Sequence, residues 1–294
     1  MSIVDLITLT LKISILLTLF GFALQVSVHD VTSLFHHPAR LLRAIFAMNV
    51  VMPVLAVLLA LQLNLRPEIE FIIVAFALSP MPPFLPRTQV KAGGDTALVA
   101  GLLTASSLCA VVVIPVAMLL IEALLSRPPV VPVGRVAVVV LTSVLGPLLT
   151  GLAMHHLGPQ LAVRLVKPVT ALGMLLLAAS GLAIAAGSFR AMISMTGDGT
   201  VVAIAAMVAT GLVVGTILGG PKADDRTVLA LATAARHPGV ALAVTSANFA
   251  DQKTLLNATL LYLIVSVLMT TPFALWRGRR HAAEKPTPLT RKAT

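Results

Sequence analysis

The sequence predicts an all-α membrane protein of nine transmembrane helices, whose core is an inverted repeat with two broken helices. Hydrophobic residues make up 58% of the chain and charged residues 11%, whereas a soluble domain has about 45–50% and about 25%. The apolar residues gather in stretches of roughly 20 residues, the length that crosses a bilayer. Two of these stretches are interrupted in the middle, which in polytopic proteins indicates a transporter's binding site.

Nine apolar stretches follow one another, and no polar segment between them is long enough for a second domain. The third and the eighth carry the interruptions. The first lacks a signal-peptide cleavage site and is expected to be a retained helix. The expected spans are residues 3–28, 39–63, 69–91, 96–125, 134–157, 165–187, 200–219, 226–249 and 254–276. They form one transmembrane domain, residues 1–276, followed by a basic cytoplasmic tail over 277–294 that is expected to be disordered.

The basic residues are placed as membrane topology requires. The chain has a formal net charge of +10, and most lysines and arginines lie on one predicted side, including Arg40, Arg43 and the tail. Such an excess marks the cytoplasmic side, so we expect the C-terminus in the cytoplasm and the N-terminus outside. Arg87 and Lys91 on that side could also steer anions. The expected location is the cell inner (plasma) membrane, as a multi-pass monomer in the lipid bilayer, and a nucleic-acid partner is not expected.

The first interruption is rich in proline, and the second combines a charge with proline and glycine. Proline lacks an N–H donor and disfavours a helical residue before it, so each cluster should break its helix. The second interruption reads Arg236-His237-Pro238-Gly239, with no acidic residue within ten positions. The predicted helix-break residues are Pro80, Pro82, Pro83, Pro86 and Pro238.

A weak internal repeat relates the two interruptions. Pro82 precedes Asp95 by thirteen positions, and Pro238 precedes Asp251 by the same number. Both aspartates stand at the start of the next predicted helix, where an N-cap belongs. The two copies are an odd number of spans apart and therefore face opposite ways, which is the inverted-repeat arrangement.

Arg236 is the strongest candidate for a binding residue. A charge near the bilayer centre costs several kcal/mol unless it is paired or hydrated, and helix breaks are buried against other protein. The helix halves that begin near Phe84 and Gly239 should also point N–H groups at the crossing region, which favours an anion. These features predict a small organic anion as the partner. The alternative is that the Arg236 side chain snorkels to the cytoplasmic surface.

Polar side chains around the breaks are further candidates. His237 could contact substrate or carry a proton near neutral pH; alternatively, it bonds an orphan carbonyl at the break. Other polar residues could line the site, although membrane hydroxyls more often bond their own helix. These are Thr88, Gln89, Thr245, Ser246 and Asn248. No metal or cofactor is expected, because Cys109 is the only cysteine and the histidine pairs at 36–37 and 155–156 diverge on a helix.

Three stretches resemble the bile acid:sodium symporter family. Residues 20–40 are similar to its F-x-M-G-L helix end and loop, residues 79–107 to its P-G-G-T-x-S-N break and G-D-x-A-L-S helix start, and residues 233–249 to its E-V-G-M-Q-N-S-G-L-A segment. The resemblance implies a core with two crossing broken helices and a separate panel domain. The panel helices would be residues 3–28, 134–157 and 165–187, and the core helices would lie within 39–125 and 200–276.

The sequence departs from this family where its sodium ligands would align. The aligned residues are Leu85, Pro86, Val99, Leu103, Ala232 and Arg236. Sodium requires hard oxygen ligands, and none of these side chains carries an oxygen. Arg236 aligns with a glutamine of the family, and a glutamate four positions earlier is lost as well. We therefore expect Arg236 to act as a built-in cation in place of sodium.

The expected function is a secondary transporter of an organic anion, working by alternating access without sodium. Proton coupling through His237, exchange and uniport stay open. One alternative is a sodium-coupled, bile acid-like symporter that binds sodium through backbone carbonyls. Another is a membrane sensor that binds the anion without transporting it. An enzyme is not expected and no catalytic residue is predicted, because no span carries an aspartate or glutamate near its centre.

Overall fold

The computed structural model describes residues 3–63, 65–124, 133–194, 199–245 and 252–284, and these residues form helices without any strand. In the labels below, η1 is a 3-10 helix, and η2 and η3 are π-helical turns. The elements are α1 (Ile3–Ala23), α2 (Val28–Thr32), η1 (Ser33–His36), α3 (Pro38–Phe46), η2 (Ala47–Val51), α4 (Met52–Gln62), α5 (Pro67–Leu78), α6 (Leu85–Lys91), α7 (Thr96–Leu124), α8 (Val133–Val140), η3 (Leu141–Leu145), α9 (Gly146–Leu157), α10 (Pro159–Ser194), α11 (Thr200–Leu218), α12 (Ala223–Ala234), α13 (Pro238–Thr245) and α14 (Gln252–Glu284).

Six helices of the described chain are long and apolar enough to cross a membrane, and a bent pair raises the number to seven. The bent pair joins α1 to α2 and η1 through a turn of 103°. The interrupted pairs α5–α6 and α12–α13 consist of helices too short to be counted alone. The structure thus confirms an all-helical, multi-pass membrane protein, while the nine-span count stays a prediction.

Every predicted span contains a described helix, but several predicted ends are wrong. α1 ends at Ala23 rather than 28, and α10 begins at Pro159 rather than 165. α10 continues to Ser194 rather than ending at 187, and α14 continues to Glu284 although the sequence predicts a tail from 277. The residues after 276 are rich in arginine and alanine, which are good helix formers. They are also bonded to the fold, since Arg277 Nε donates to Thr227 Oγ1 of α12 at 2.6 Å. The last turns of α14 are therefore part of the packed structure.

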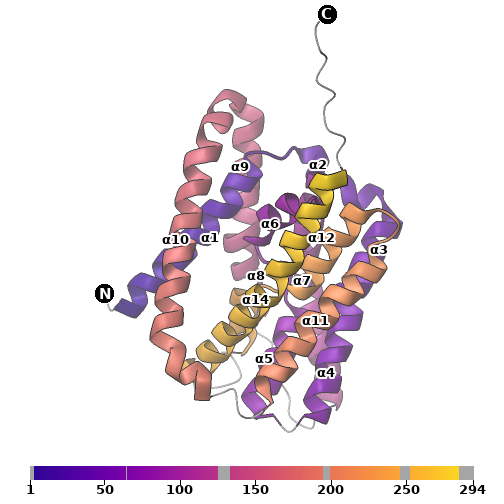
Figure 1. Ribbon diagram of the computed structural model, residues 1–294, viewed down its shortest axis with the longest axis vertical. Helices are drawn as coiled ribbons and strands as arrows, with labels where there is room; N and C mark the ends of the chain where they lie inside the picture. Colours follow the sequence, from indigo (N-terminus) through magenta and orange to yellow (C-terminus); the bar gives the residue numbers. More distant parts are fainter. Residues whose placement is uncertain (1–2, 64, 125–132, 195–198, 246–251, 285–294) are drawn as a thin grey trace, which may run out of the picture.

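The helices form two groups (Figure 1). α1, α9 and α10 pack on one another on the left of the view, and most of the remaining helices lie to their right. Small residues bring the first group close together: a Cβ at Gly21 would lie 2.5 Å from Thr170 Oγ1, and one at Gly173 would lie 2.9 Å from Thr18 N. Close approach at small residues is how membrane helices associate without a hydrophobic driving force.

A glycine ridge on α11 seats α12. Gly211, Gly215 and Gly219 recur every fourth residue, so they share one face of the helix. A Cβ at Gly215 would lie 2.4 Å from Ala230 Cα, and one at Gly211 would lie 2.7 Å from Ala234 Cα. A larger residue at either position would push α12 away. The ridge therefore holds the end of α12, where the second break begins.

Two π-helical turns interrupt otherwise regular helices. Each is followed by a proline, Pro53 after η2 and Pro147 after η3. The missing N–H and the ring of proline prevent the usual bond to the carbonyl four residues earlier, which lies inside the π turn in both cases. Turns of this kind occur frequently at functional sites. Both of these turns contact the second break, as described below.

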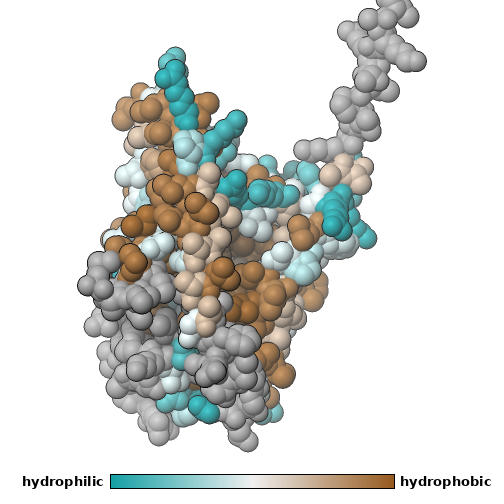
Figure 2. All heavy atoms as spheres, turned by 60° about the vertical axis from the view of Figure 1, so that its left-hand side comes forward, coloured by the Kyte–Doolittle hydropathy of each residue, from teal (hydrophilic) through white to brown (hydrophobic). Residues whose placement is uncertain are grey.

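The surface fits a lipid environment. Large apolar side chains such as Leu42, Leu149 and Leu175 are more than half exposed. Figure 2 shows hydrophobic side chains over the middle of one face, while hydrophilic side chains gather at its upper end. A belt of exposed apolar surface with a polar end is what a bilayer requires of a spanning protein.

Candidate functional site

The two interrupted pairs cross and touch at their breaks. α5 packs beside α13 and α6 beside α12, so the first half of each pair meets the second half of the other. The breaks are bonded directly, because His237 N donates to the Pro80 carbonyl at 2.9 Å. The arms of the crossing, α6 and α12, are bonded as well, since Gln89 Nε2 of α6 donates to the Val228 carbonyl of α12 at 2.8 Å. The predicted meeting of the two breaks is thus present.

Arg236 lies between the breaks and is only 1% exposed. Its Nη1 donates to the Ser79 carbonyl at 3.0 Å, its Nη2 to the Met48 carbonyl at 2.9 Å and its Nε to the Thr233 carbonyl at 3.2 Å. These carbonyls belong to the first break, to η2 and to α12, so one guanidinium joins three segments. The alternative of a side chain that snorkels to the surface is wrong for this structure. The bonded carbonyl oxygens are the kind of ligand that a bound metal cation uses.

His237 is 2% exposed and caps α13. Its Nδ1 accepts from the N–H of Gly239 at 3.1 Å and from that of Val240 at 3.4 Å. A ring nitrogen that accepts carries no proton, so the proton is on Nε2, which lies 3.1 Å from Ser143 Oγ of η3. The structure corrects two expectations here. The ring bonds N–H groups instead of an orphan carbonyl, and it occupies the very N–H groups that the sequence predicts would face an anion.

The candidates near the first break lie in three different environments. Phe84, the residue before α6, is half-buried, and Thr88 is exposed. Gln89 is fully buried between α6 and α12, and its Oε1 has no partner among the described residues. Gln89 therefore links the two arms of the crossing, and a substrate contact of these three residues stays a prediction.

The candidates after the second break are only partly described. Thr245 is buried, and its Oγ1 donates to the Ala241 carbonyl at 3.0 Å. The hydroxyl thus bonds its own helix, as the alternative predicts. Ser246 and Asn248 lie outside the described residues.

The five break prolines divide into two kinds. Pro80, Pro82 and Pro83 lie in the first break and are buried. Pro86 and Pro238 instead lie in the first turn of α6 and of α13, where the missing N–H costs no helical bond. The first break thus offers several carbonyls and few N–H groups. The second break donates its hydrogen bonds to two of these carbonyls, those of Ser79 and Pro80.

The positions that resemble the family's sodium ligands are filled by hydrocarbon. Leu85, Val99, Leu103 and Ala232 belong to one buried apolar cluster, and Pro86 is buried next to it in the chain. Apolar side chains cannot replace the water around a cation. Within the described ranges, no three His, Cys, Asp or Glu side chains cluster as metal ligands.

A cavity of about 440 Å³ opens between the two helix groups. Its charged lining residues are Arg87 and Lys91 of α6 and Lys167 of α10. Apolar residues such as Phe22 and hydroxyls such as Thr170 complete its walls. None of the predicted substrate contacts lines it.

Lys167 and Thr170 are candidates that the sequence analysis missed. A lysine near the end of a span normally serves topology, so Lys167 carries no distinct signal by itself. A usable signal is the spacing of three between the two residues, which places both on one face of α10.

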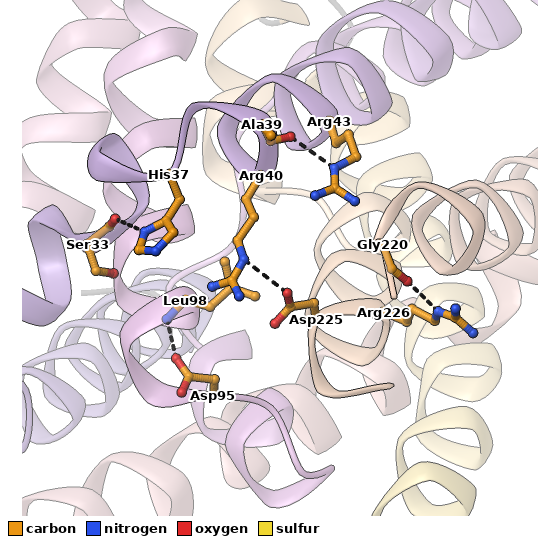
Figure 3. A network of polar contacts seen from close by, with 10 residues as sticks. All are labelled: Ser33, His37, Ala39, Arg40, Arg43, Asp95, Leu98, Gly220, Asp225 and Arg226. Atoms are coloured by element: carbon orange, nitrogen blue, oxygen red, sulfur yellow. Dashed lines mark hydrogen bonds and ion pairs between the residues drawn. The ribbon is translucent and has the colours of Figure 1, made fainter. Parts of the chain in front are cut away.

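Polar side chains also connect the helices where α3 and α12 begin (Figure 3). Arg40 Nε lies 3.2 Å from Asp225 Oδ2. Burial raises the pKa of the Asp225 carboxyl, an effect that the Arg40 guanidinium offsets only in part. Asp95 Oδ1 accepts from Leu98 N at 2.8 Å, so Asp95 caps α7 as predicted. Asp251, its predicted counterpart, lies outside the described residues.

The chain matches the Sodium Bile acid symporter family over residues 12–195. The match covers more than half of the 294 residues and includes the first break and the three cations of the cavity. The second pair, with Arg236 and His237, lies beyond it. No curated protein matches the chain. On the strength of the family match, the chain belongs to the sodium bile acid symporter family, a family of membrane transporters.

Proposed function

We propose that the protein is a secondary transporter of an organic anion that works without sodium, with the Arg236 guanidinium in the place of a bound cation. The observation that carries the proposal is the position of that guanidinium, buried between the breaks with its donors on three carbonyls. A sodium ion must bind and leave in each cycle, whereas a side chain stays. The positive charge at the crossing is then permanent, and substrate binding needs no ion.

The same geometry favours an anionic substrate. The carbonyl partners of Arg236 are neutral, so the site keeps a net positive charge in surroundings of low dielectric, where an anion is strongly attracted. His237 would contact the substrate once its ring turns away from Ser143. The remaining proposed contacts are Phe84, Thr88, Gln89, Gly239, Thr245, Ser246 and Asn248.

The proposed architecture has nine spans, and transport follows from it. The nine are the six counted helices, α1 and the two interrupted pairs. The pairs would form the inverted-repeat core, and α1, α8–α9 and α10 would form the panel, which the separate packing of α1, α9 and α10 supports. Alternating access would come from movement of the core against the panel, with the C-terminus in the cytoplasm.

The test is uptake of labelled organic acids by the purified protein in liposomes, with sodium either present or replaced by a large organic cation. Equal rates in the two media are expected. Stimulation by sodium would overturn the proposal in favour of a symporter that binds sodium through backbone carbonyls. Saturable binding without any flux would favour the membrane sensor.

A substitution at the crossing tests the fixed cation itself. Arg236→Gln should lower uptake at least about tenfold, because a buried hydrogen-bonded charge is lost. The matched control is Arg226→Gln, since Arg226 is exposed and donates to the nearby Gly220 carbonyl at 2.6 Å. Wild-type uptake by Arg236→Gln would show that the guanidinium has no role in transport.

A further inference from the structure

The cavity between the two helix groups carries cations on both of its walls. Arg87 and Lys91 belong to α6, which packs with α12 and α7, whereas Lys167 belongs to α10, which packs with α1 and α9. No acidic side chain is among the described residues that line it. The proposed transport cycle would move these two walls against each other.

The distribution of charge limits which ligand fits. Like charges that surround one volume repel each other, and a ligand must neutralise them if the walls are to approach. A ligand with one negative group can pair with one wall only. A ligand with two separated negative groups can pair with both walls and connect them.

The surface between the cations is largely apolar. Phe22, Val166 and Ala171 line the wall of α1 and α10, and Val90 lines the wall of α6. An inorganic anion would leave this surface without contact. The volume of about 440 Å³ falls in the range of pockets for small organic molecules, about 300–1,000 Å³.

We infer that this cavity binds an organic dianion whose two acidic groups are joined by an apolar segment. One group pairs with Arg87 and Lys91, and the other pairs with Lys167. The inference rests on the proposed function, because it names the substrate class of the same transporter, at a site separate from the contacts proposed at the crossing. It also assigns the ligand a part in the transport cycle, because only a ligand with two negative groups connects α10 of the proposed panel to α6 of the proposed core.

An anionic phospholipid offers similar chemistry, with a charged headgroup next to hydrocarbon. The experiment therefore starts from the full chain in nanodiscs of phosphatidylcholine, which has no net charge. Binding of α,ω-dicarboxylates of increasing length is measured by calorimetry against monocarboxylates of the same length. A second arm repeats the measurement with phosphatidylglycerol in the nanodisc.

The dicarboxylates should bind at least about tenfold more tightly than the monocarboxylates, and their affinity should fall as salt screens the charges. Phosphatidylglycerol should leave this preference in place. Equal affinity for the two series would overturn the inference. Loss of dicarboxylate binding in phosphatidylglycerol would also overturn it, because the cavity would then be a site for lipid headgroups.

Variants on each wall locate the binding. Lys167→Gln and Arg87→Gln should each weaken dicarboxylate binding by about two- to fivefold, the size of one partly exposed ion pair. They should reduce the preference for dicarboxylates over monocarboxylates. The matched control is Arg164→Gln, because Arg164 is an exposed cation on the same helix that does not line the cavity. Equal effects of Lys167→Gln and Arg164→Gln would contradict the inference.

Binding in nanodiscs and flux in liposomes separate this inference from the proposed function. Tight dicarboxylate binding without uptake would contradict transport and leave the dianion site in place. Uptake of organic acids without any preference for two charges would contradict the dianion site and leave the transporter in place.

Discussion

The two breaks meet at one place but supply opposite halves of its hydrogen bonds. The first break, residues 79–84, contributes acceptors: the Ser79 carbonyl accepts from a guanidinium and the Pro80 carbonyl accepts from a main-chain N–H. The second break, residues 235–237, contributes the donors through Arg236 and His237. Three prolines explain the asymmetry, because they remove N–H groups from the first break and leave its carbonyls.

This difference shows how one break can supply the hydrogen-bond donors that the other break lacks. Buried carbonyls that have lost their helical partners need donors or a cation, since leaving them unpaired is costly. In this chain the donors are covalently attached to the opposite break. The proline-rich break and the arginine-bearing break are thus complementary, and changing either should disturb the other.

Arg236→Leu should disturb the contact between the two breaks most strongly. It leaves the Ser79 and Met48 carbonyls without their charged donor in a buried site. Loss of one partner of a buried charged contact costs about 3–5 kcal/mol, which corresponds to a melting temperature lower by about 10 °C. Thermal unfolding of the purified protein in detergent measures the change. Arg226→Leu, at an exposed position, is the control, and similar melting temperatures of the two variants would show that the guanidinium does not hold the breaks together.

His237→Ala should have the next largest effect. It removes the acceptor for two N–H groups of α13 and the contact with Ser143, and we expect a loss of about 2–3 kcal/mol in the free energy of unfolding. A double-mutant cycle with Ser143→Ala isolates the contact between the break and η3, with an expected coupling of about 0.5–1.5 kcal/mol.

The control for this cycle is Thr142→Ala, because Thr142 is exposed and bonds the Val138 carbonyl of its own helix. It should show no coupling to His237. Coupling as large as that of Ser143 would mean that the substitutions act through the helix as a whole.

Pro80→Ala tests the proline-rich break. The substitution places a new N–H donor in a buried segment and raises the conformational entropy of the unfolded chain, so we expect a loss of about 2 kcal/mol in the free energy of unfolding. Chemical unfolding of the variant measures this loss. Pro159→Ala is the matched control, since Pro159 is exposed at the start of α10 and should show only the unfolded-state part, about 0.4–1 kcal/mol. Equal losses would mean that the missing donor at position 80 is unimportant.

Local features of this fold could be predicted from the sequence because their causes are local. Apolar runs predicted the helices of all nine expected spans but not α2 and η1, which lie between the first two spans. Proline and glycine predicted both breaks, with Pro238 the first residue of α13. The end of α14 was mispredicted because charged residues usually close a span, whereas a helix can continue past the membrane. Asp95 was predicted as a cap because capping depends only on the neighbouring residues.

The partners across the fold could not be predicted, because they depend on how helices pack. Arg236 bonds Ser79 and Met48, which lie 157 and 188 positions away in the sequence, and His237 contacts Ser143 at a separation of 94. A burial requirement was evident for the arginine, but its three carbonyls were not. The cavity was missed for the same reason, since its walls come from α1, α6, α7 and α10.

The arms of the crossing should be less sensitive than the breaks, and Gln89→Leu measures that difference. The substitution removes the bond from Gln89 Nε2 to the Val228 carbonyl, but it also removes an Oε1 that has no described partner. Because the lost hydrogen bond is offset by removal of a buried oxygen without a described partner, the net change should be below about 1 kcal/mol. Gln160→Leu, at an exposed position of α10, serves as the reference. A loss for Gln89→Leu as large as that for Arg236→Leu would mean that the arms, and not the complementary breaks, hold the crossing together.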